Sequence, residues 1–238
     1  MTHDVIVIGG SYAGMAAALQ LLRARRSVLI IDAGRRRNRS ASHSHGFLAQ
    51  DGADPAELAR TARAQLIAYP TLTWLEGEAE RATGTHDAFE VTVQGNTQSG
   101  KRLLFATGVL DELPDIPGMQ ERWGCSVFHC PYCHGYELDQ GRIGVIATGP
   151  MSVHQAQLVA EWGEVTFFSN GACELDADAM AELSGRGISL EQTPVARIEG
   201  HADVVLDDGR QLSFAGLFTA PRNRPATSIA EALGCELV

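Results

Sequence analysis

The sequence has no long hydrophobic run. No apolar stretch approaches the ~20 residues that a helix needs to cross a bilayer. The first eight residues lack a basic start followed by an apolar core, and they are typical of a β-strand, so a secretory signal is not expected. We therefore expect a cytoplasmic protein that does not associate with membranes.

Positive charge is scarce. The 238 residues include 19 Lys and Arg against 29 Asp and Glu, which gives a formal net charge of −10. This balance argues against nucleic-acid partners and against adhesion to anionic membranes. The hydrophobic content of 45% and the charged content of 20% are ordinary for a globular protein. The length allows one large domain or two ordinary ones.

Cysteine occurs at only five positions, and in a cytosolic chain this favours catalysis over a disulfide framework. Two of the five lie in the segment 129–137, which reads HCPYCHGYE. Pro131 suits the first turn of a helix, which would place Cys130 at a helix N-terminus, where the dipole favours a thiolate. A reactive thiolate with a second sulfur, Cys133, close by is what thiol–disulfide exchange needs. The segment therefore predicts a redox-active pair.

Two other uses of this pair remain open. Cys125, Cys130 and Cys133 could bind zinc together with a histidine, although such sites usually need a second clustered pair. Cys173 and Cys235 are isolated and do not supply one. An inert structural disulfide is the other alternative, and such bonds are uncommon in cytosolic proteins.

The N-terminal third predicts a βαβ unit that binds an ADP-containing cofactor. A strand over Asp4–Ile8 runs into the turn GGSYAG at residues 9–14, and a helix follows to about Arg25. A second strand, Ser27–Ile31, ends at Asp32, close to the spacing expected for a carboxylate that binds a ribose hydroxyl. The middle glycine of the usual pattern is Ser11, which hampers close approach of a phosphate without excluding it.

Two polar loops follow. The basic cluster Arg35–Arg39 is either a solvated turn or a contact for the adenosine or phosphate end of the cofactor. The run 43–52 reads HSHGFLAQDG. His43 and His45 could bind a metal there, but no pair of carboxylates completes a site.

The next segment predicts a helix from Asp54 to about Ala68. Four short strands near 72–75, 79–82, 89–93 and 102–105 predict a β-meander. Ala106, Thr107 and Gly108 end the last strand with small residues that would let the backbone approach a ligand. The Pro/Gly-rich stretch 113–118 predicts a boundary between domains 1–113 and 114–238.

A second, weaker βαβ unit begins with a strand over 142–146. Its glycine turn is reduced to Ala147, Thr148 and Gly149, and a helix (153–162) and a strand (165–168) follow. The strand ends at Phe168-Ser169-Asn170, which offers neither a carboxylate for a ribose diol nor an arginine for a 2′-phosphate. Binding of a nicotinamide nucleotide and loss of that binding both remain open.

Three motifs together resemble the low-molecular-weight thioredoxin reductases: DVIVIGG at 4–10, ATG at 106–108, and CPYC at 130–133. The resemblance covers essentially the whole chain. It implies an α/β fold of two Rossmann-like domains with a β-meander, FAD as cofactor, NADPH as a possible co-substrate, and a homodimer. It also implies that Cys133 faces the flavin and that Cys130 exchanges with the substrate.

Three features depart from that family. His134 stands where its reductases commonly have Asp, and this version of the motif is more similar to a branch that contains dithiol oxidases of the gliotoxin and holomycin type. The weakened second turn is the next departure. The last is that no Gly-Asp segment of the kind that meets the flavin in the family follows Pro221. We therefore expect an FAD domain that is incomplete at its C-terminus.

The expected activity is an FAD-dependent thiol–disulfide oxidoreductase that passes electrons from NAD(P)H through FAD and Cys130–Cys133 to a thioredoxin-like protein. The alternatives are oxygen-dependent oxidation of a small-molecule dithiol and a non-catalytic remnant. We expect Cys130, Cys133 and His134 to carry the chemistry, with His134 moving a proton near neutral pH. The residues expected to contact the cofactor are Gly9, Gly10, Ser11, Ala13, Gly14, Asp32, Ala33, Arg39, Gln50, Asp51, Ala106, Thr107 and Gly108.

Overall fold

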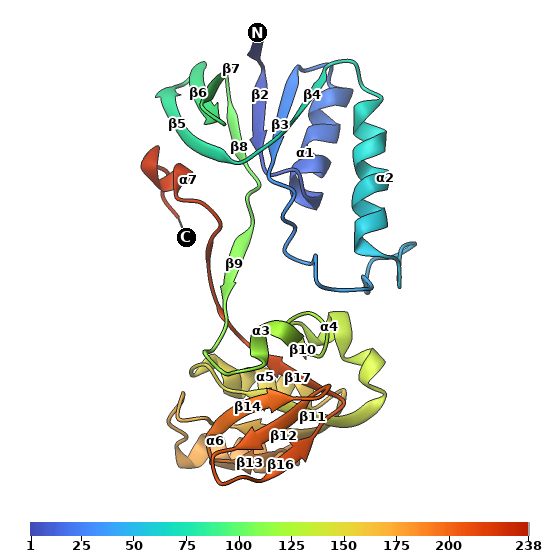
Figure 1. Cartoon of the computed structure of the whole chain (residues 1–238), viewed down its shortest axis with the longest axis vertical. Helices are drawn as coiled ribbons and strands as arrows, with labels where there is room; N and C mark the ends of the chain where they lie inside the picture. The colour runs from blue at the N-terminus through green and yellow to red at the C-terminus, as the bar shows by residue number, and fades with distance from the viewer. Residues whose placement is uncertain (238) are drawn as a thin grey trace. The chain divides into compact units, whose positions relative to one another are not determined.

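The computed structural model describes residues 1–237, which form two compact units (Figure 1). Each unit is discontinuous in sequence. Unit 1 comprises Met1–Arg39, Asp54–Leu110 and Arg224–Val238, and unit 2 comprises Ser40–Ala53 and Asp111–Asn223. None of the helices within residues 1–237 is both long and apolar enough to cross a membrane.

Unit 1 is built on a parallel sheet with strand order β4-β3-β2-β8. The strands are β2 (Val5–Ile8), β3 (Val28–Asp32), β4 (Leu72–Glu76) and β8 (Leu103–Phe105). The two central strands consist almost entirely of Val, Ile and Leu, because a strand covered on both faces needs apolar side chains on both. The predicted βαβ unit with its strand, turn, helix and acidic strand end is confirmed.

Two helices cover one face of this sheet, as Figure 1 shows. Helix α1 (Tyr12–Arg23) packs Met15 and Leu22 against the sheet. Helix α2 (Pro55–Ile67) begins as predicted, because Asp54 caps it by accepting the backbone N–H of Ala56 at 2.6 Å, and Pro occupies the first turn.

A second sheet, with strand order β1-β7-β6-β5, covers the other face. Its strands are β1 (Thr2–His3), β5 (Ala79–Thr85), β6 (Ala88–Val93) and β7 (Asn96–Gly100). The four-strand meander predicted over 72–105 is wrong in its membership, because β4 and β8 belong to the parallel sheet. Both strands are short and apolar, and their partners β3 and β2 lie far away in sequence, so local pattern could not reveal the pairing.

The C-terminal segment also belongs to unit 1. The short helix α7 (Ile229–Ala232) places Ile229, which is buried, in the core shared by the two sheets. Before it, β18 (Arg222–Pro225) pairs with β9 (Val109–Glu112) as a two-stranded sheet.

Unit 2 has a five-stranded parallel sheet with strand order β10-β17-β11-β12-β13. Its strands are β10 (Val127–Phe128), β11 (Gln140–Ile146), β12 (Gly163–Phe168), β13 (Ser189–Glu191) and β17 (Gly216–Thr219). Helices α5 (Met151–Val159) and α6 (Ala177–Gly185) pack on one face. An antiparallel meander of β14 (Val195–Glu199), β15 (Asp203–Leu206) and β16 (Gln211–Ser213) packs on the other. The result is a second three-layer α/β unit.

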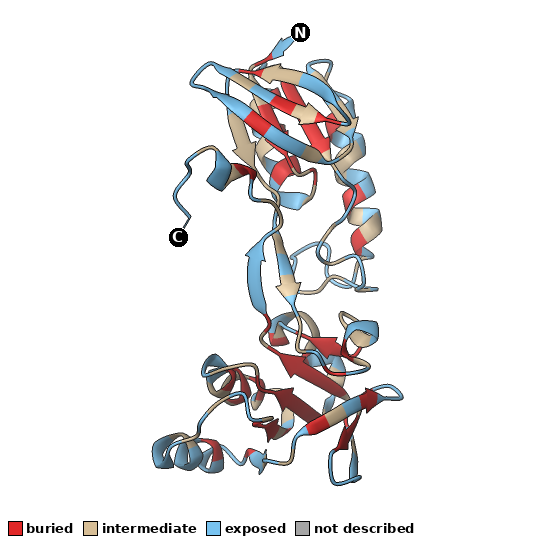
Figure 2. Ribbon diagram, turned by 60° about the vertical axis from the view of Figure 1, so that its left-hand side comes forward, coloured by how far each residue is buried: buried red, intermediate tan, exposed pale blue. Residues whose placement is uncertain are grey.

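The core of each unit lies on its central strands, and Figure 2 shows the buried residues concentrated there. Between β9 and β11 lie three short helices: α3 (Met119–Arg122), α4 (Pro131–His134) and the 3₁₀ turn η1 (Tyr136–Leu138). The mixed α/β fold with parallel sheets agrees with the sequence prediction.

A carboxylate at the end of β13 gives unit 2 a test of acid stability. Arg210 donates from Nη1 to Glu191 Oε2 at 2.6 Å, and the Thr193 backbone N–H donates to Glu191 Oε1 at 2.8 Å. These bonds, led by Arg210, hold the pKa of Glu191 at about 2, below its ordinary value of 4.5. Because the folded state binds the proton more weakly than the unfolded state, this contribution to stability is present above pH 4.5 and is lost as the pH falls toward 2.

We expect Glu191→Gln to lower the free energy of unfolding by about 1–2 kcal/mol at pH 7. Urea unfolding across a pH series should show the difference shrinking below pH 4.5. Glu161→Gln, whose carboxylate is exposed 3.7 Å from Arg186, is the matched control and should change stability by less than about 0.5 kcal/mol. A difference that stayed constant down to acid pH would contradict the assignment.

Candidate active site

The segment with two cysteines folds as a tight turn at the start of α4. Cys130 is the residue that precedes the helix, and Pro131 occupies the first helical position, as the sequence predicts. The thiol of Cys133 donates to Cys130 Sγ, and the two sulfur atoms are 2.7 Å apart. The Cys133 backbone N–H donates to the Cys130 carbonyl at 3.3 Å. None of the five cysteines, all within residues 1–237, forms a disulfide.

The two sulfur atoms are chemically unequal. Burial, then the hydrogen bond to Cys130 and the charge of that neighbour, raise the pKa of Cys133 to about 12, from its ordinary value of 9.0. Cys133 therefore holds its proton at neutral pH in this state. Its contribution to stability is complete below pH 9.0 and is lost as the pH rises toward 12, because the unfolded chain gives up the proton first.

His134 follows Cys133 directly and lies against the aromatic ring of Phe128. The two rings stack with centroids 4.2 Å apart and an interplanar angle of 17°. Burial lowers the pKa of His134 below its ordinary value, while Glu137 raises it and His45 lowers it further. The imidazole is therefore neutral at pH 7 and can accept a proton.

The loop 43–52 lies beside this turn, within unit 2. His45 Nδ1 lies 3.4 Å from Glu137 Oε1 and 3.5 Å from Asp51 Oδ1. The Gly46 backbone N–H donates to Asp51 Oδ1 at 2.8 Å. The sequence does not predict this arrangement. Its pattern suggests His45 only as a metal ligand and gives no role to Glu137.

The glycine turn of unit 1 forms a close-packed corner between β2, α1 and β8. Gly9 has φ +107°, and a Cβ there would lie 2.3 Å from the Ala106 carbonyl oxygen. A Cβ on Gly14 would lie 1.9 Å from the Gly9 carbonyl oxygen. The Gly10 backbone N–H donates to Asp32 Oδ1 at 3.2 Å. The turn, the acidic strand end and the end of β8 thus meet at one place.

The remaining predicted cofactor residues are divided between the units. Ser11 precedes α1, Ala13 lies in its first turn, and Ala33 is exposed after Asp32. Arg39 is exposed and donates to the Arg36 carbonyl at 2.9 Å. Thr107 and Gly108 follow the end of β8 in unit 1, whereas Gln50 and Asp51 lie in the loop 43–52 of unit 2.

Known proteins match the chain along its whole length. The family profile described as pyridine nucleotide-disulphide oxidoreductase matches residues 3–238. The chain belongs to this family. Thioredoxin reductase tcpT of Claviceps purpurea is 34% identical over 92% of this chain and 86% of its own length. A solved oxidoreductase from Agrobacterium tumefaciens is 56% identical, with a TM-score of 0.97 over 99% of this chain and 80% of that one. The protein in the crystal structure of HlmI is 39% identical, with a TM-score of 0.93 over 99% of this chain and 76% of that one.

This pyridine nucleotide-disulphide oxidoreductase is a thioredoxin reductase-like flavoprotein that uses FAD, with NADPH as the co-substrate of its family. The glycine turn fits the diphosphate of such a cofactor. Helix α1 is preceded by Ser11, which makes no side-chain cap, and its first turn has no acidic residue, so its N-terminal amides are left for a phosphate. The carboxylate at this turn, Asp32, accepts the Gly10 N–H. The small residues of the turn let its backbone approach a diphosphate closely.

The corresponding turn in unit 2 is filled by its own side chains. The Thr148 backbone N–H donates to Ser152 Oγ at 2.9 Å, and Thr148 Oγ1 donates to the Ala220 carbonyl at 2.6 Å. Asn170, at the end of β12, accepts the Val195 backbone N–H at 2.9 Å. These groups serve the fold of the oxidoreductase, and a nucleotide phosphate would have to compete with Ser152 for the turn.

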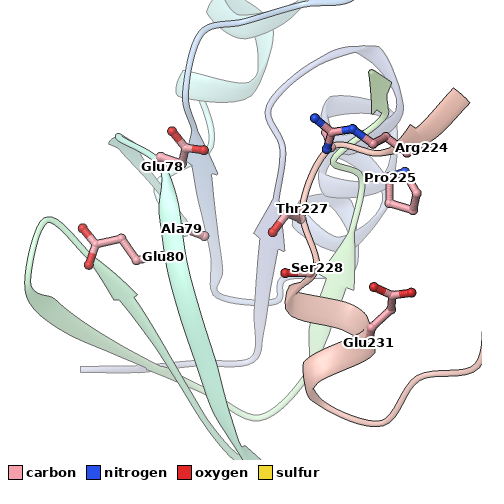
Figure 3. A pocket seen from close by; sticks show the side chains of 9 residues that line it. Glu78, Ala79, Glu80, Arg224, Pro225, Thr227, Ser228 and Glu231 are labelled. Atoms are coloured by element: carbon pink, nitrogen blue, oxygen red, sulfur yellow. The ribbon is translucent and has the colours of Figure 1, made fainter. Parts of the chain in front are cut away.

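A cavity of about 750 Å³ in unit 1 is lined by carboxylates (Figure 3). Glu78, Glu80 and Glu231 contribute to its lining, with Arg224 as the one cation among the lining residues. Glu78 also pairs with Arg35, whose Nη2 lies 2.6 Å away. This excess of negative charge disfavours a diphosphate, so we do not place the cofactor's phosphates there.

Among residues 1–237, no group of three or more His, Cys, Asp and Glu side chains is arranged to hold a metal ion. The zinc alternative for the cysteine pair therefore has no ligand set in the described part of the chain.

Proposed function

We propose that the chain exchanges electrons between FAD and the Cys130–Cys133 pair, and that the pair then exchanges with a disulfide substrate. The observation that carries this proposal is the 2.7 Å approach of the two sulfur atoms at the N-terminal end of α4. Proximity alone makes intramolecular disulfide formation fast relative to reaction with outside thiols. FAD, when bound, supplies the two-electron step.

In the reducing direction, the Cys130 thiolate attacks one sulfur of the substrate disulfide, so a mixed disulfide forms and the other substrate sulfur leaves as a thiolate. Cys133 then loses its proton and attacks Cys130, which releases the second substrate sulfur. The substrate gains two electrons and two protons, and the chain is left with a Cys130–Cys133 disulfide.

The residues divide the work by their surroundings. Cys133 keeps its proton at rest because its pKa is raised, so an acceptor is needed in the second step. The neutral imidazole of His134, adjacent in α4, takes that proton on a ring nitrogen. Unit 1 supplies the diphosphate site at the turn 9–14, and we assign the FAD role to domain 1–113 and the dithiol role to domain 114–238. A thioredoxin-like protein is the proposed substrate and a homodimer the proposed assembly.

The second candidate is oxidation of a small-molecule dithiol, in which the electrons move the opposite way. The dithiol reduces the Cys130–Cys133 disulfide and leaves as a disulfide. FAD, if held at the turn 9–14, would accept the two electrons and two protons, with oxygen as the final oxidant and peroxide as its product. The closure of the unit 2 turn by Thr148 and Ser152 favours this direction, because the reducing direction needs a bound nicotinamide nucleotide.

Two parallel measurements, one anaerobic and one in air, separate the two directions. The FAD-loaded chain is titrated with NADPH while the visible flavin absorbance is followed, and a parallel sample in air receives dithiothreitol while peroxide is measured. Bleaching by NADPH supports the reductase. Peroxide with dithiothreitol and no bleaching by NADPH supports the oxidase. Absence of both would contradict the proposal that the pair communicates with the flavin.

A further inference from the structure

His45 connects the loop 43–52 to the turn that carries the dithiol. Its Nδ1 lies between two carboxylates, one from its own loop (Asp51, 3.5 Å) and one from η1 (Glu137, 3.4 Å). The side chain of His45 is only 21% exposed, whereas that of Asp51 is 70% exposed. The side chain of Glu137 is 41% exposed, so of the two contacts the one with Glu137 is the less open to solvent and the less screened.

A second contact holds the same loop against the turn. Gly46 has φ +76°, and a Cβ at this position would come within 4.0 Å of the Tyr132 carbonyl oxygen, which lies between the two cysteines. Gly46 is anchored in turn by its N–H, which donates to Asp51. The loop backbone at Gly46 thus lies beside the segment 130–133, as does the His45–Glu137 contact.

Both members of the pair also shift the pKa of His134. Glu137, three residues after His134, raises this pKa, and His45 lowers it. The other ring packed on His134 is that of Phe128, which carries no charge. The groups that face His45 are Asp51, Glu137 and, with ring centroids 6.2 Å apart, His43.

We propose that His45 and Glu137 are positioning residues of the dithiol reaction: their contact holds the loop 43–52 beside the Cys130–Cys133 turn and next to His134. The proposal rests on the proposed function, because it assigns His134 the proton of Cys133. It adds a loop distant in sequence to the machinery of that proton transfer. Glu137 stabilises the protonated imidazole after transfer.

The first test is the titration of His134 by NMR in the reduced chain. Glu137→Gln removes a group that raises the pKa of His134 and should lower that pKa, whereas His45→Gln removes a group that lowers it and should raise it. His86→Gln, in which an exposed His that pairs with Asp87 at 3.0 Å in unit 1 is changed, should leave it unmoved. Shifts of equal sign in the two variants, or no shift in either, would overturn the proposal, since loss of packing alone does not produce opposite signs.

The second test measures how fast a protease cuts the loop and how fast the Cys130–Cys133 disulfide is reduced. Chymotrypsin should cut after Phe47 or Leu48, both exposed, about two- to fivefold faster in either variant, as loss of one partly sheltered ion pair allows. Reduction of the Cys130–Cys133 disulfide by dithiothreitol is followed by alkylation and mass spectrometry from pH 5 to about 9. Relative to His86→Gln, the midpoint of the rate profile should move down for Glu137→Gln and up for His45→Gln.

The two proposals fail in different ways. If oxidation of the parent chain produces no Cys130–Cys133 disulfide that dithiothreitol can reduce, the proposed function fails. If that disulfide forms and is reduced normally, but the variants share the parent's rate profile and cleavage rate, only the role of His45 and Glu137 is wrong.

Discussion

Replacing Cys133 by serine is expected to abolish disulfide exchange, with a loss of at least about 10³-fold in substrate reduction or dithiol oxidation. Cys130 can still attack a substrate disulfide, but no second sulfur lies 2.7 Å away to release it. The mixed disulfide should therefore accumulate. Mass spectrometry of the chain after reaction with a small disulfide measures it directly as added mass at Cys130.

The complementary variant Cys130→Ser should change the remaining sulfur in a different way. It removes the charge of Cys130 and replaces the sulfur that accepts the Cys133 hydrogen bond, and it leaves burial, the largest cause of the raised pKa of Cys133, in place. The pKa of Cys133 should fall while it stays above its ordinary value of 9.0, and alkylation of Cys133 at fixed alkaline pH should become faster than in the parent.

Cys125→Ser is the matched control for both variants. Cys125 lies in the same unit, is exposed, and donates only to the Ser40 carbonyl at 3.6 Å. It should retain parental activity. If Cys133→Ser kept exchange activity, or if Cys125→Ser lost it, the assignment of the reacting pair would be wrong.

Replacing Gly9 by alanine is expected to destabilise unit 1 by about 2–4 kcal/mol and to remove most bound FAD. A Cβ at this position would lie 2.3 Å from the Ala106 oxygen and 2.7 Å from the Ala106 carbonyl carbon, both backbone atoms. The φ of +107° adds strain that no side chain relieves. Either the glycine turn or the end of β8 must move, and both lie at the proposed diphosphate site.

Gly95→Ala separates the two causes of this effect. Gly95 also has a positive φ, +72°, in unit 1, but nothing lies within 4 Å of the position of a Cβ there. It should therefore show only the backbone strain, about 1 kcal/mol, and keep its flavin. Urea unfolding and the ratio of flavin to protein absorbance measure the two effects. Equal losses in both variants would show that steric contact with Ala106 is unimportant.

The sequence predicted the parts of this protein that depend on local pattern. The apolar strands around Val7 and Ile30, the cap at Asp54 and the helix that starts at Pro131 all follow from residue types a few positions apart. The membership of the meander was wrong because β4 and β8 pair with strands distant in sequence. The assignment of Cys130, Cys133 and His134 to the chemistry stays a prediction, and the geometry supports it.

The contribution of His45 could not be predicted for the same reason. Its partner Glu137 is 92 positions away (137 − 45), and nothing in the run HSHGFLAQDG indicates where the loop lies. The two carboxylates that face His45 come from different segments, which explains why no local pair was found. A histidine flanked by glycine in a polar loop is the only signal that was available, and it is a weak one.

The segment Ser40–Ala53 has a practical consequence for dissecting the protein. It is packed with unit 2 although unit 1 residues flank it on both sides, and Arg224–Val238 returns to unit 1 at the other end. A gene cut near codon 111 would give two polypeptides, each deprived of residues that its compact unit requires. Such halves should expose apolar surface and aggregate when produced alone, and they should regain solubility when they are co-expressed and complement each other.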